Sequence, residues 1–344
     1  MTTGAAVGDR PLQPVAREPA AGAFATTPGE RKRERLAYWG YRAAEAVLQR
    51  LPRAALLPLS AAAATGVFAI APEKRALTQD NLARPLRLPA DHPRVRRAAL
   101  RAFRNYGKYL IDMMRLPALD DAAVDDLVRI ENIESLTQAR APGKGVLLCC
   151  VHVGGMDVIG PALKRHGQRM HVVADDTSYG RLFEHLRAVR QRHEIHLIPW
   201  RNLRQLFRAL RDGENLVLFC DWGYRSGDVP VELFGEPTTF PAGPATLAAK
   251  SGAPMLPVHV RRTRDDRFVA RGLPLVRAAA TDPAELYRAT QQLADALSSV
   301  IAADPGQWYI FRHIWPQTDV ERDFARTALE AARRGDDWTR LRPG

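Results

Sequence analysis

The sequence predicts an α/β fold in which a largely parallel central sheet is flanked by helices, preceded by a mostly helical N-terminal region. Residues 145–151 form a continuous apolar run bounded by Pro142-Gly143 and by His152. Such a run is typical of a strand buried on both faces. After it, apolar strand-like segments alternate with segments of helical periodicity, and this alternation indicates a parallel sheet.

The N-terminal elements follow from composition and spacing. Residues 1–30 are rich in Ala, Gly, Pro and Thr without a periodic pattern, so we expect a disordered tail. Helical spacing then predicts helices over residues 35–51, 54–71 and 94–116. An acidic connection over 119–133 and a short helix over 132–139 complete this part.

The second half of the chain supplies the remaining elements. We expect strands over residues 145–151, 170–174, 195–199, 215–220 and 255–260, with an edge strand over 268–273. Helices are expected over 158–165, 179–193, 204–211, 245–251 and 282–302, the last beginning with an Asp-Pro pair. We therefore expect a tail (1–30), a helical region (31–140), an α/β core (141–320) and a C-terminal helix or tail (321–344), with 31–320 forming one structural unit.

The chain is strongly basic, with a formal net charge of +12 that comes from 44 arginines and only six lysines. Such a charge attracts polyanions, whether nucleic acid, anionic lipid headgroups or phosphorylated small molecules. A GC-rich genome that encodes Arg in place of Lys would give the same excess. The sequence has no RNP-like strand, zinc-finger spacing or helix-turn-helix pattern, so an anionic membrane surface is the expected partner and nucleic acid is not.

Residues 54–71 are the best candidate for contact with a membrane. The segment lacks charges, but it contains Pro58, is dominated by alanine and, at about 18 residues, is at the lower limit for a span. The cations of residues 31–35 and the rings of Tyr38 and Trp39 suit the headgroup region. We expect a helix lying on the bilayer rather than a true span.

His152 is the predicted catalytic base. It directly follows the buried strand, and Gly154-Gly155 allow a tight turn before Asp157. A carboxylate against one imidazole nitrogen would fix the tautomer and leave the other nitrogen free to take a proton from a substrate hydroxyl. The N–H groups of Gly154 and Gly155 are candidates to receive an oxyanion.

Four further residues are candidate substrate contacts. Arg190 and Arg225 have the guanidinium groups that bind phosphate or pyrophosphate, although both also fit as ordinary surface arginines. Asp221 follows a strand and is a candidate to position an arginine or an acceptor hydroxyl, and Glu232 is a candidate to line the acceptor site. The three cysteines show neither disulfide nor metal spacing, which favours a reducing compartment. The histidines also lack metal-ligand spacing, so no metal is expected.

Seven segments together resemble the bacterial lipid A late acyltransferases and the phosphatidylinositol mannoside acyltransferases, within the larger glycerolipid acyltransferase group. They are Asn81-Leu82, His152-x4-Asp157 and residues 186–199, 231–237, 240–245, 252–258 and 305–315. The resemblance implies acyl transfer at the cytoplasmic face of the inner membrane, from acyl-CoA or acyl carrier protein to a glycolipid hydroxyl, with no other cofactor.

Two departures from the wider group bear on the acceptor and on membrane attachment. Glycerol-phosphate acyltransferases typically carry a Glu-Gly-Thr-Arg block, whereas the matching region here reads Asp221-Trp-Gly-Tyr-Arg225. The clear N-terminal spanning helix of many lipid A enzymes is also absent. A lysophospholipid or glycerol-phosphate acceptor, and a non-catalytic basic protein that binds nucleic acid or membranes, remain the alternatives.

Overall fold

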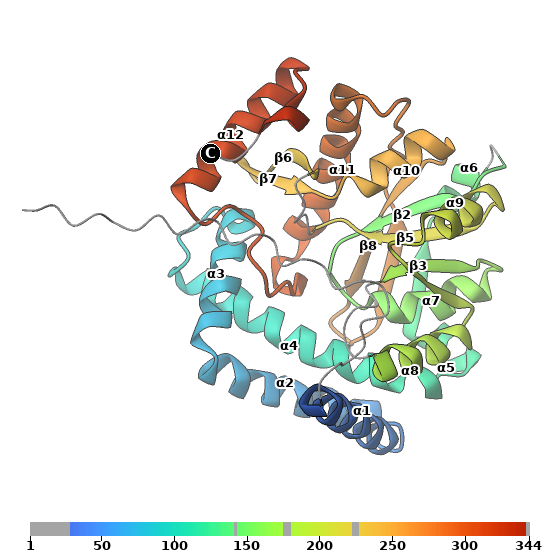
Figure 1. Cartoon of the computed structure of the whole chain (residues 1–344). Coiled ribbons are helices and arrows are strands. Elements are labelled where there is room, and N and C mark those ends of the chain that lie inside the picture. Colours follow the sequence, from blue (N-terminus) through green and yellow to red (C-terminus); the bar gives the residue numbers. More distant parts are fainter. Residues whose placement is uncertain (1–27, 141–142, 175–179, 222–226, 342–344) are drawn as a thin grey trace, which may run out of the picture.

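The computed structural model describes residues 28–140, 143–174, 180–221 and 227–341 (Figure 1). Within them, seven strands form a sheet in the order β1-β9-β8-β2-β5-β3-β4, and β6 and β7 form a separate hairpin. Strands β8, β2, β5, β3 and β4 are parallel, whereas β1 and β9 run antiparallel to them. The prediction of an α/β fold with a largely parallel sheet is confirmed.

The strands of the main sheet are β1 Val128–Glu131, β2 Val146–Cys150, β3 Met170–Ala174, β4 Ile195–Pro199, β5 Asn215–Phe219, β8 Met255–Arg262 and β9 Phe268–Gly272; the hairpin is β6 Val229–Leu233 and β7 Glu236–Phe240. The α-helices of the described residues are α1 Pro28–Leu48, α2 Arg53–Ile70, α3 Pro72–Leu86, α4 Pro93–Arg115, α5 Asp121–Leu127, α6 Glu134–Arg140, α7 Met156–Arg165, α8 Gly180–Gln191, α9 Leu203–Arg211, α10 Gly243–Ser251, α11 Pro283–Ala303 and α12 Asp319–Arg334.

Strand β2 lies at the centre of the sheet, and all five of its side chains are buried. Because successive side chains of a strand point to opposite faces, they enter two different cores. Leu147 and Cys149 pack with side chains of α4, α10 and α11, whereas Val146, Leu148 and Cys150 pack with side chains of α6 and α7. In Figure 1, α10 and α11 accordingly lie on one side of the sheet and α7 and α8 on the other.

The prediction of an edge strand at residues 268–273 is wrong. Strand β9 lies between β8 and β1, and β1 occupies the edge of the sheet. β1 falls within the segment predicted as an acidic connection. It has only four residues, of which Arg129 and Glu131 are charged, so it lacks the apolar run that marks the inner strands. Short, charged strands are common at sheet edges.

The N-terminal helices are joined to the sheet through a buried carboxylate. Asp112 of α4 accepts hydrogen bonds from Arg53 of α2 and from Arg262 of β8, both at 2.7 Å. Helix α1 in turn packs on α8, where Glu45 meets His185 at 3.0 Å. Residues 1–27 of the predicted tail lie outside the described residues, and α1 begins at Pro28.

Candidate active site

His152 lies two residues beyond the carboxyl end of β2. In the register of β2 with β5, Cys150 is level with Phe219, so the second residue after each strand, His152 and Asp221, meet side by side. The Nδ1 atom of His152 is 2.8 Å from Oδ1 of Asp221, and the imidazole ring stacks on the Phe219 ring at 4.3 Å between centroids. The side chain of His152 is 33% exposed, whereas that of Asp221 is fully buried.

The surroundings of Asp221 fix its charge and the tautomer of His152. Its Oδ2 accepts hydrogen bonds from the backbone N–H of His152 and from Nε1–H of Trp308, each at 2.9 Å. Burial alone would raise the pKa of Asp221, but the charge and hydrogen bonds of His152 and the hydrogen bond from Trp308 hold that pKa below its ordinary value. An ionised Asp221 can only accept, so His152 donates from Nδ1. The Nε2 atom of His152 has no hydrogen bond to any residue that the structure describes.

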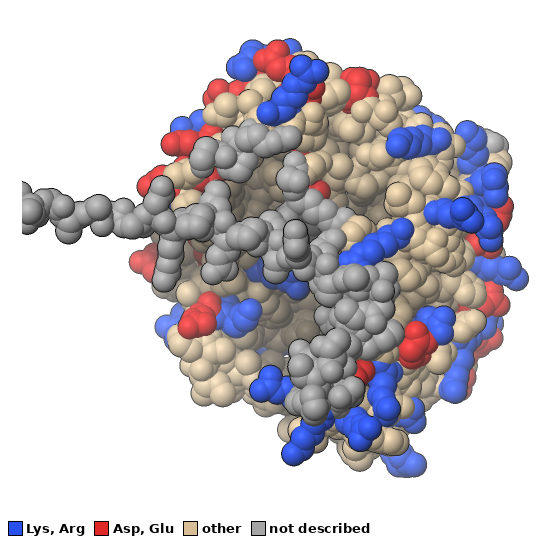
Figure 2. All heavy atoms as spheres, viewed as in Figure 1, with Lys and Arg blue, Asp and Glu red and all other residues tan. Residues whose placement is uncertain are grey.

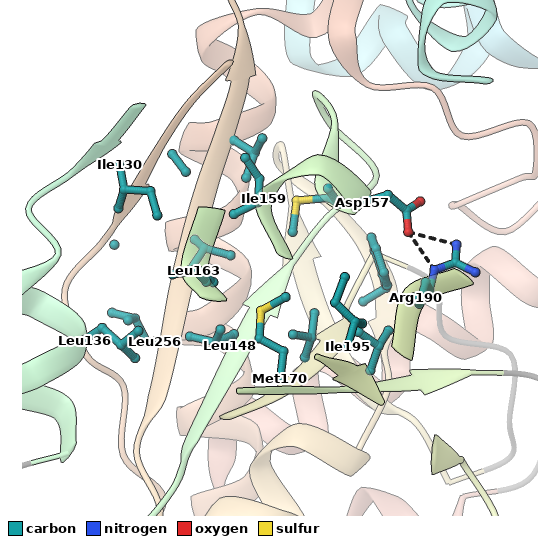
Figure 3. Close-up of a pocket in the computed structure, with 18 of the residues that line it drawn as sticks. Ile130, Leu136, Leu148, Asp157, Ile159, Leu163, Met170, Arg190, Ile195 and Leu256 are labelled. Carbon is teal, nitrogen blue, oxygen red and sulfur yellow. Dashed lines mark hydrogen bonds and ion pairs between the residues drawn. The ribbon is translucent and has the colours of Figure 1, made fainter. Parts of the chain in front are cut away.

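Asp157 lies in the first turn of α7 and has other partners. Its Oδ1 accepts a hydrogen bond from Nε of Arg190 and forms an ion pair with Nη2, both at 2.8 Å (Figure 3). Its Oδ2 accepts a hydrogen bond of 2.5 Å from the hydroxyl of Tyr109. Burial would raise the pKa of Asp157, but the positive charge of Arg190 and these hydrogen bonds hold the pKa below its ordinary value.

The expected contact of Asp157 with the His152 ring is therefore not what the structure describes, because Nδ1 of His152 meets Asp221 instead. The two residues of the H-x4-D pattern are close in sequence, but the first turn of α7 directs the Asp157 carboxylate towards α4 and α8. Arg190 is correspondingly an internal partner of a carboxylate, with its side chain only 14% exposed.

The turn between β2 and α7 requires both of its glycines. Gly154 has φ +74°, and a Cβ atom there would lie 2.5 Å from the carbonyl oxygen of Val260. A Cβ atom on Gly155 would lie 2.3 Å from the Phe268 ring. The hydroxyl of Tyr309 donates to the Gly154 carbonyl at 2.6 Å. Val153 forms an isolated antiparallel bridge with Trp308, which turns the Gly154 N–H towards the carbonyl of Gln307. The Gly155 N–H, at the N-cap of α7, has no acceptor among the described residues and is available to a ligand.

An apolar cavity of about 350 Å³ opens beside His152. It runs between the sheet and helices α6, α7 and α8, and most of its lining side chains are apolar. Figure 3 shows Asp157 and Arg190 at one end and Ile130, Leu136 and Leu256 at the other. Its volume is within the ~300–1,000 Å³ range of small-molecule sites. A cavity of this shape and polarity accepts an alkyl chain.

The structure does not bring every predicted residue to this cavity. Glu232 of β6 pairs with Arg333 of α12 at 2.5 Å and does not line the cavity. Its predicted role in the acceptor site is thus unsupported by its position. Arg225 lies outside the described residues. Within the described part of the chain, no group of three or more His, Cys, Asp or Glu side chains is arranged to hold a metal ion.

Residue patterns did not identify three members of the site: Tyr109, Trp308 and Tyr309. Segment 305–315 contributes to the family resemblance, but the resemblance gives its aromatic residues no role in the site. The indole of Trp308 is buried, and its N–H group donates a hydrogen bond to Asp221, the carboxylate that contacts His152. A buried tryptophan needs an acceptor for its N–H, and that need was the signal available in the sequence.

Comparison with known proteins gives one family. The family model for the bacterial lipid A biosynthesis acyltransferase matches residues 27–317. A phosphatidylinositol mannoside acyltransferase of Mycolicibacterium smegmatis is 28% identical over 242 residues, which cover 68% of this chain and 77% of the relative. A phosphatidylinositol mannoside acyltransferase of Mycobacterium tuberculosis is 30% identical over 225 residues, which cover 61% and 68% respectively. The chain therefore belongs to the bacterial lipid A biosynthesis acyltransferase family and is an acyltransferase.

Proposed function

We propose that this chain transfers a fatty acyl group from acyl-CoA or acyl carrier protein to a hydroxyl of a membrane glycolipid of the phosphatidylinositol mannoside type, with His152 as general base. The observation that carries this proposal is the pairing of His152 with the buried Asp221 at 2.8 Å, at the mouth of an apolar cavity of about 350 Å³. A base and an alkyl-chain site are the two parts that acyl transfer to an alcohol needs.

The base acts through Nε2 of His152. Asp221 accepts the Nδ1 proton, which leaves Nε2 with a lone pair towards solvent. Nε2 removes the proton of the acceptor hydroxyl while the oxygen attacks the thioester carbonyl, and the Asp221 carboxylate stabilises the imidazolium that forms. The substrate hydroxyl thus takes the place that a serine has in a hydrolase.

Attack on the thioester gives a tetrahedral intermediate with a negatively charged oxygen. The Gly155 N–H, which has no acceptor among the described residues, is suited to receive it, and the neighbouring Gly154 N–H is a second candidate. When the intermediate collapses, the carbon–sulfur bond breaks, and the imidazolium returns the proton to the leaving thiolate. The products are an ester and a free thiol, and His152 recovers its neutral form.

A covalent acyl-enzyme on cysteine does not fit the site. Cys149, Cys150 and Cys220 are buried and free, and burial raises the pKa of the Cys150 thiol well above its ordinary value. A neutral, inaccessible thiol is a poor nucleophile. Direct attack by the acceptor hydroxyl is therefore the mechanism that the described residues support.

The acceptor class comes from the relatives, whose names specify phosphatidylinositol mannoside. The cytoplasmic face of the membrane is the location that the family resemblance implies. Attachment to a membrane is supported by α2, which by length and composition alone could span a bilayer. Its Leu56 and Phe68 are buried against the rest of the fold, while Leu59 and Ile70 are 66% and 81% exposed. A helix held at both ends and apolar on its outer face favours peripheral attachment over a span.

The test uses purified full chain, radiolabelled palmitoyl-CoA or palmitoyl acyl carrier protein, and three acceptors in parallel: a phosphatidylinositol mannoside, a lipid A precursor and lysophosphatidic acid. We expect transfer to the phosphatidylinositol mannoside, and about a 10²–10⁴-fold lower rate in His152→Ala. His166→Ala, which removes an exposed histidine at the end of α7, is the matched control and should keep the full rate.

Two results would contradict the proposal separately. A His152→Ala variant that turns over normally would remove the base mechanism. Transfer to lysophosphatidic acid, with none to either glycolipid, would keep the enzyme class and the base but replace the acceptor.

A further inference from the structure

A second cavity, of about 700 Å³, lies between α2, α4 and the turn that joins β8 to β9. Its remaining wall comes from Asp304 and from Gln307 in the short 3₁₀ helix Pro305–Gln307. No residue lines both this cavity and the apolar cavity beside His152. The face of α4 that carries Arg104 and Lys108 points into it, whereas Tyr109 contacts Asp157 in the active site.

The lining of this cavity is strongly cationic. It contains six cationic side chains and two carboxylates, so the cations exceed the carboxylates by four: Arg101, Arg104, Lys108, Arg261, Arg262 and Arg264 against Asp266 and Asp304. Each carboxylate already has a cation at hydrogen-bond distance. Arg101 lies 2.8 Å from Asp304, and Lys108 lies 2.7 Å from Asp266. The described ion pairs do not include Arg104, Arg261 or Arg264.

The guanidinium of Arg262 is a part of this cavity that the surrounding fold holds in a fixed position. Its side chain is only 3% exposed, and its Nη2 donates to Asp112 at 2.7 Å. Gln307 fixes the backbone of Arg262 through two hydrogen bonds of 2.8 Å, and the Phe268 ring lies under the guanidinium. The Nη1 atom is buried without a hydrogen-bond acceptor, since the nearest oxygen of Asp266 is 3.6 Å away.

A buried donor without an acceptor is costly, and a ligand that brings oxygen atoms removes that cost. Guanidinium groups bind phosphate oxygens in a bidentate manner. Arg104, Arg261 and Arg264 line the same cavity without a carboxylate partner among the described ion pairs, although Arg104 donates to the Thr65 hydroxyl at 2.9 Å. Together with the fixed guanidinium of Arg262 they are complementary to a phosphate rather than to a neutral sugar. The chemistry of this cavity selects an anion with several acceptor oxygens.

The wall formed by helix α2 indicates the source of the phosphate. Helix α2 contributes Pro58, Ala61, Ala62 and Thr65 to the cavity, and its outer face exposes apolar side chains such as Leu59. A phosphate bound by the arginines would thus have an apolar helix beside it on the side that faces the bilayer. We infer that this cavity binds the phosphate headgroup of an anionic membrane phospholipid, with the acyl chains lying along α2, at a site separate from catalysis.

Vesicle binding by the full chain, without acyl donor or acceptor, tests this site independently of the His152 chemistry. The probes are phosphatidylcholine vesicles with and without phosphatidylglycerol. The double variant Arg104→Gln with Arg264→Gln should bind the phosphatidylglycerol vesicles about tenfold more weakly than the wild type. The control with the same charge change, Arg211→Gln with Arg326→Gln on α9 and α12, should bind them as the wild type does.

A second pair of variants separates a cavity from diffuse surface attraction. Ala61→Trp fills the cavity without a change of charge, and Ala63→Trp adds the same ring to an exposed position of α2 outside the cavity. We expect Ala61→Trp alone to lose the preference for phosphatidylglycerol. An equal preference for phosphatidylglycerol in the two tryptophan variants would overturn the inference. Equal affinity of the two double variants for phosphatidylglycerol vesicles would overturn it as well.

The source of the phosphate is tested in the same assay. Inorganic phosphate and coenzyme A are added at millimolar concentration, and we expect neither to displace the phosphatidylglycerol vesicles. Displacement by either one, lost in the Arg104→Gln and Arg264→Gln variant, would assign the cavity to a soluble phosphate and overturn the lipid assignment.

Discussion

Asp221 contacts the proposed base His152, whereas Asp157 lines the same cavity as His152, and both are carboxylates whose pKa is held below its ordinary value. Their partners differ. Asp221 holds an imidazole, a group that can take up and release a proton during a reaction, whereas Asp157 holds a guanidinium, which is always charged. We therefore propose that the first pair transfers the proton and that the second positions α4, α7 and α8, although the sequence pattern joins His152 to Asp157.

The largest effect that separates the two carboxylates is expected from Asp221→Asn. In the wild type, the backbone N–H of His152 and the indole N–H of Trp308 both donate to Oδ2 of Asp221. In the variant, the amide oxygen must take this position, because the amide nitrogen cannot accept. The amide N–H then faces Nδ1 of His152 and forces its proton onto Nε2, where the base must be free. We expect kcat for acyl transfer to fall about 10²–10⁴-fold, as expected for loss of the correct tautomer.

The measurement is steady-state transfer from palmitoyl-CoA, with thermal unfolding recorded on the same samples. Asp212→Asn, an exposed aspartate at the end of α9, is the control. A kcat within about threefold of the wild type would show that Asp221 does not orient the base.

The next effect is on stability and comes from Asp157→Asn. This change leaves the guanidinium of Arg190, 14% exposed, without a counter-charge, and an unpaired buried charge costs about 3–5 kcal/mol. Urea unfolding should show this loss. Adding Arg190→Gln removes the stranded charge and should restore part of the stability, which would mark the pair as a positioning element.

The exposed ion pair of Arg165 with Asp125 is the control for the buried pair. Because exposed ion pairs contribute little to stability, Arg165→Gln should leave the midpoint of urea unfolding unchanged. If Asp157→Asn were as stable as this control while transfer was lost, Asp157 would have a direct part in the chemistry. The distinction between the two carboxylates would then fail.

Sequence patterns predicted the inner strands well because their signal is local. β3 and β4 are mostly apolar, with one histidine each, and this short apolar run was enough to predict their bounds, Met170–Ala174 and Ile195–Pro199. The position of His152 at the end of β2 follows from the same signal. β1 and the β6–β7 hairpin lack a continuous apolar run, because polar or charged residues interrupt their sequences.

The pairing within the site depends on contacts that no local pattern contains. His152 and Asp221 are 69 residues apart, and they meet only because β2 and β5 are neighbours in the register described above. Trp308 reaches the same carboxylate from a segment 87 residues further on. The spacing of His152 and Asp157 was visible in the sequence, but it does not show which way a carboxylate in the first turn of a helix points.

The smallest effect that we expect is a difference in acid stability. Because each carboxylate has a lowered pKa in the folded state, its contribution is fully present above the pKa of the unfolded chain, about 3.9, and is lost as the pH falls through the lower folded value. Below about pH 4 the unfolded state binds the proton first, so the free energy of unfolding should fall.

His152→Gln removes the charge that lowers the Asp221 pKa but leaves Arg190 beside Asp157. The acid slope of this variant, measured by urea unfolding between pH 7 and pH 3, should therefore be shallower than that of the wild type. Adding Asp157→Asn should flatten it further. Equal slopes in the wild type and both variants would mean that neither carboxylate is held below its ordinary pKa, and the shared charge state on which the comparison depends would be wrong.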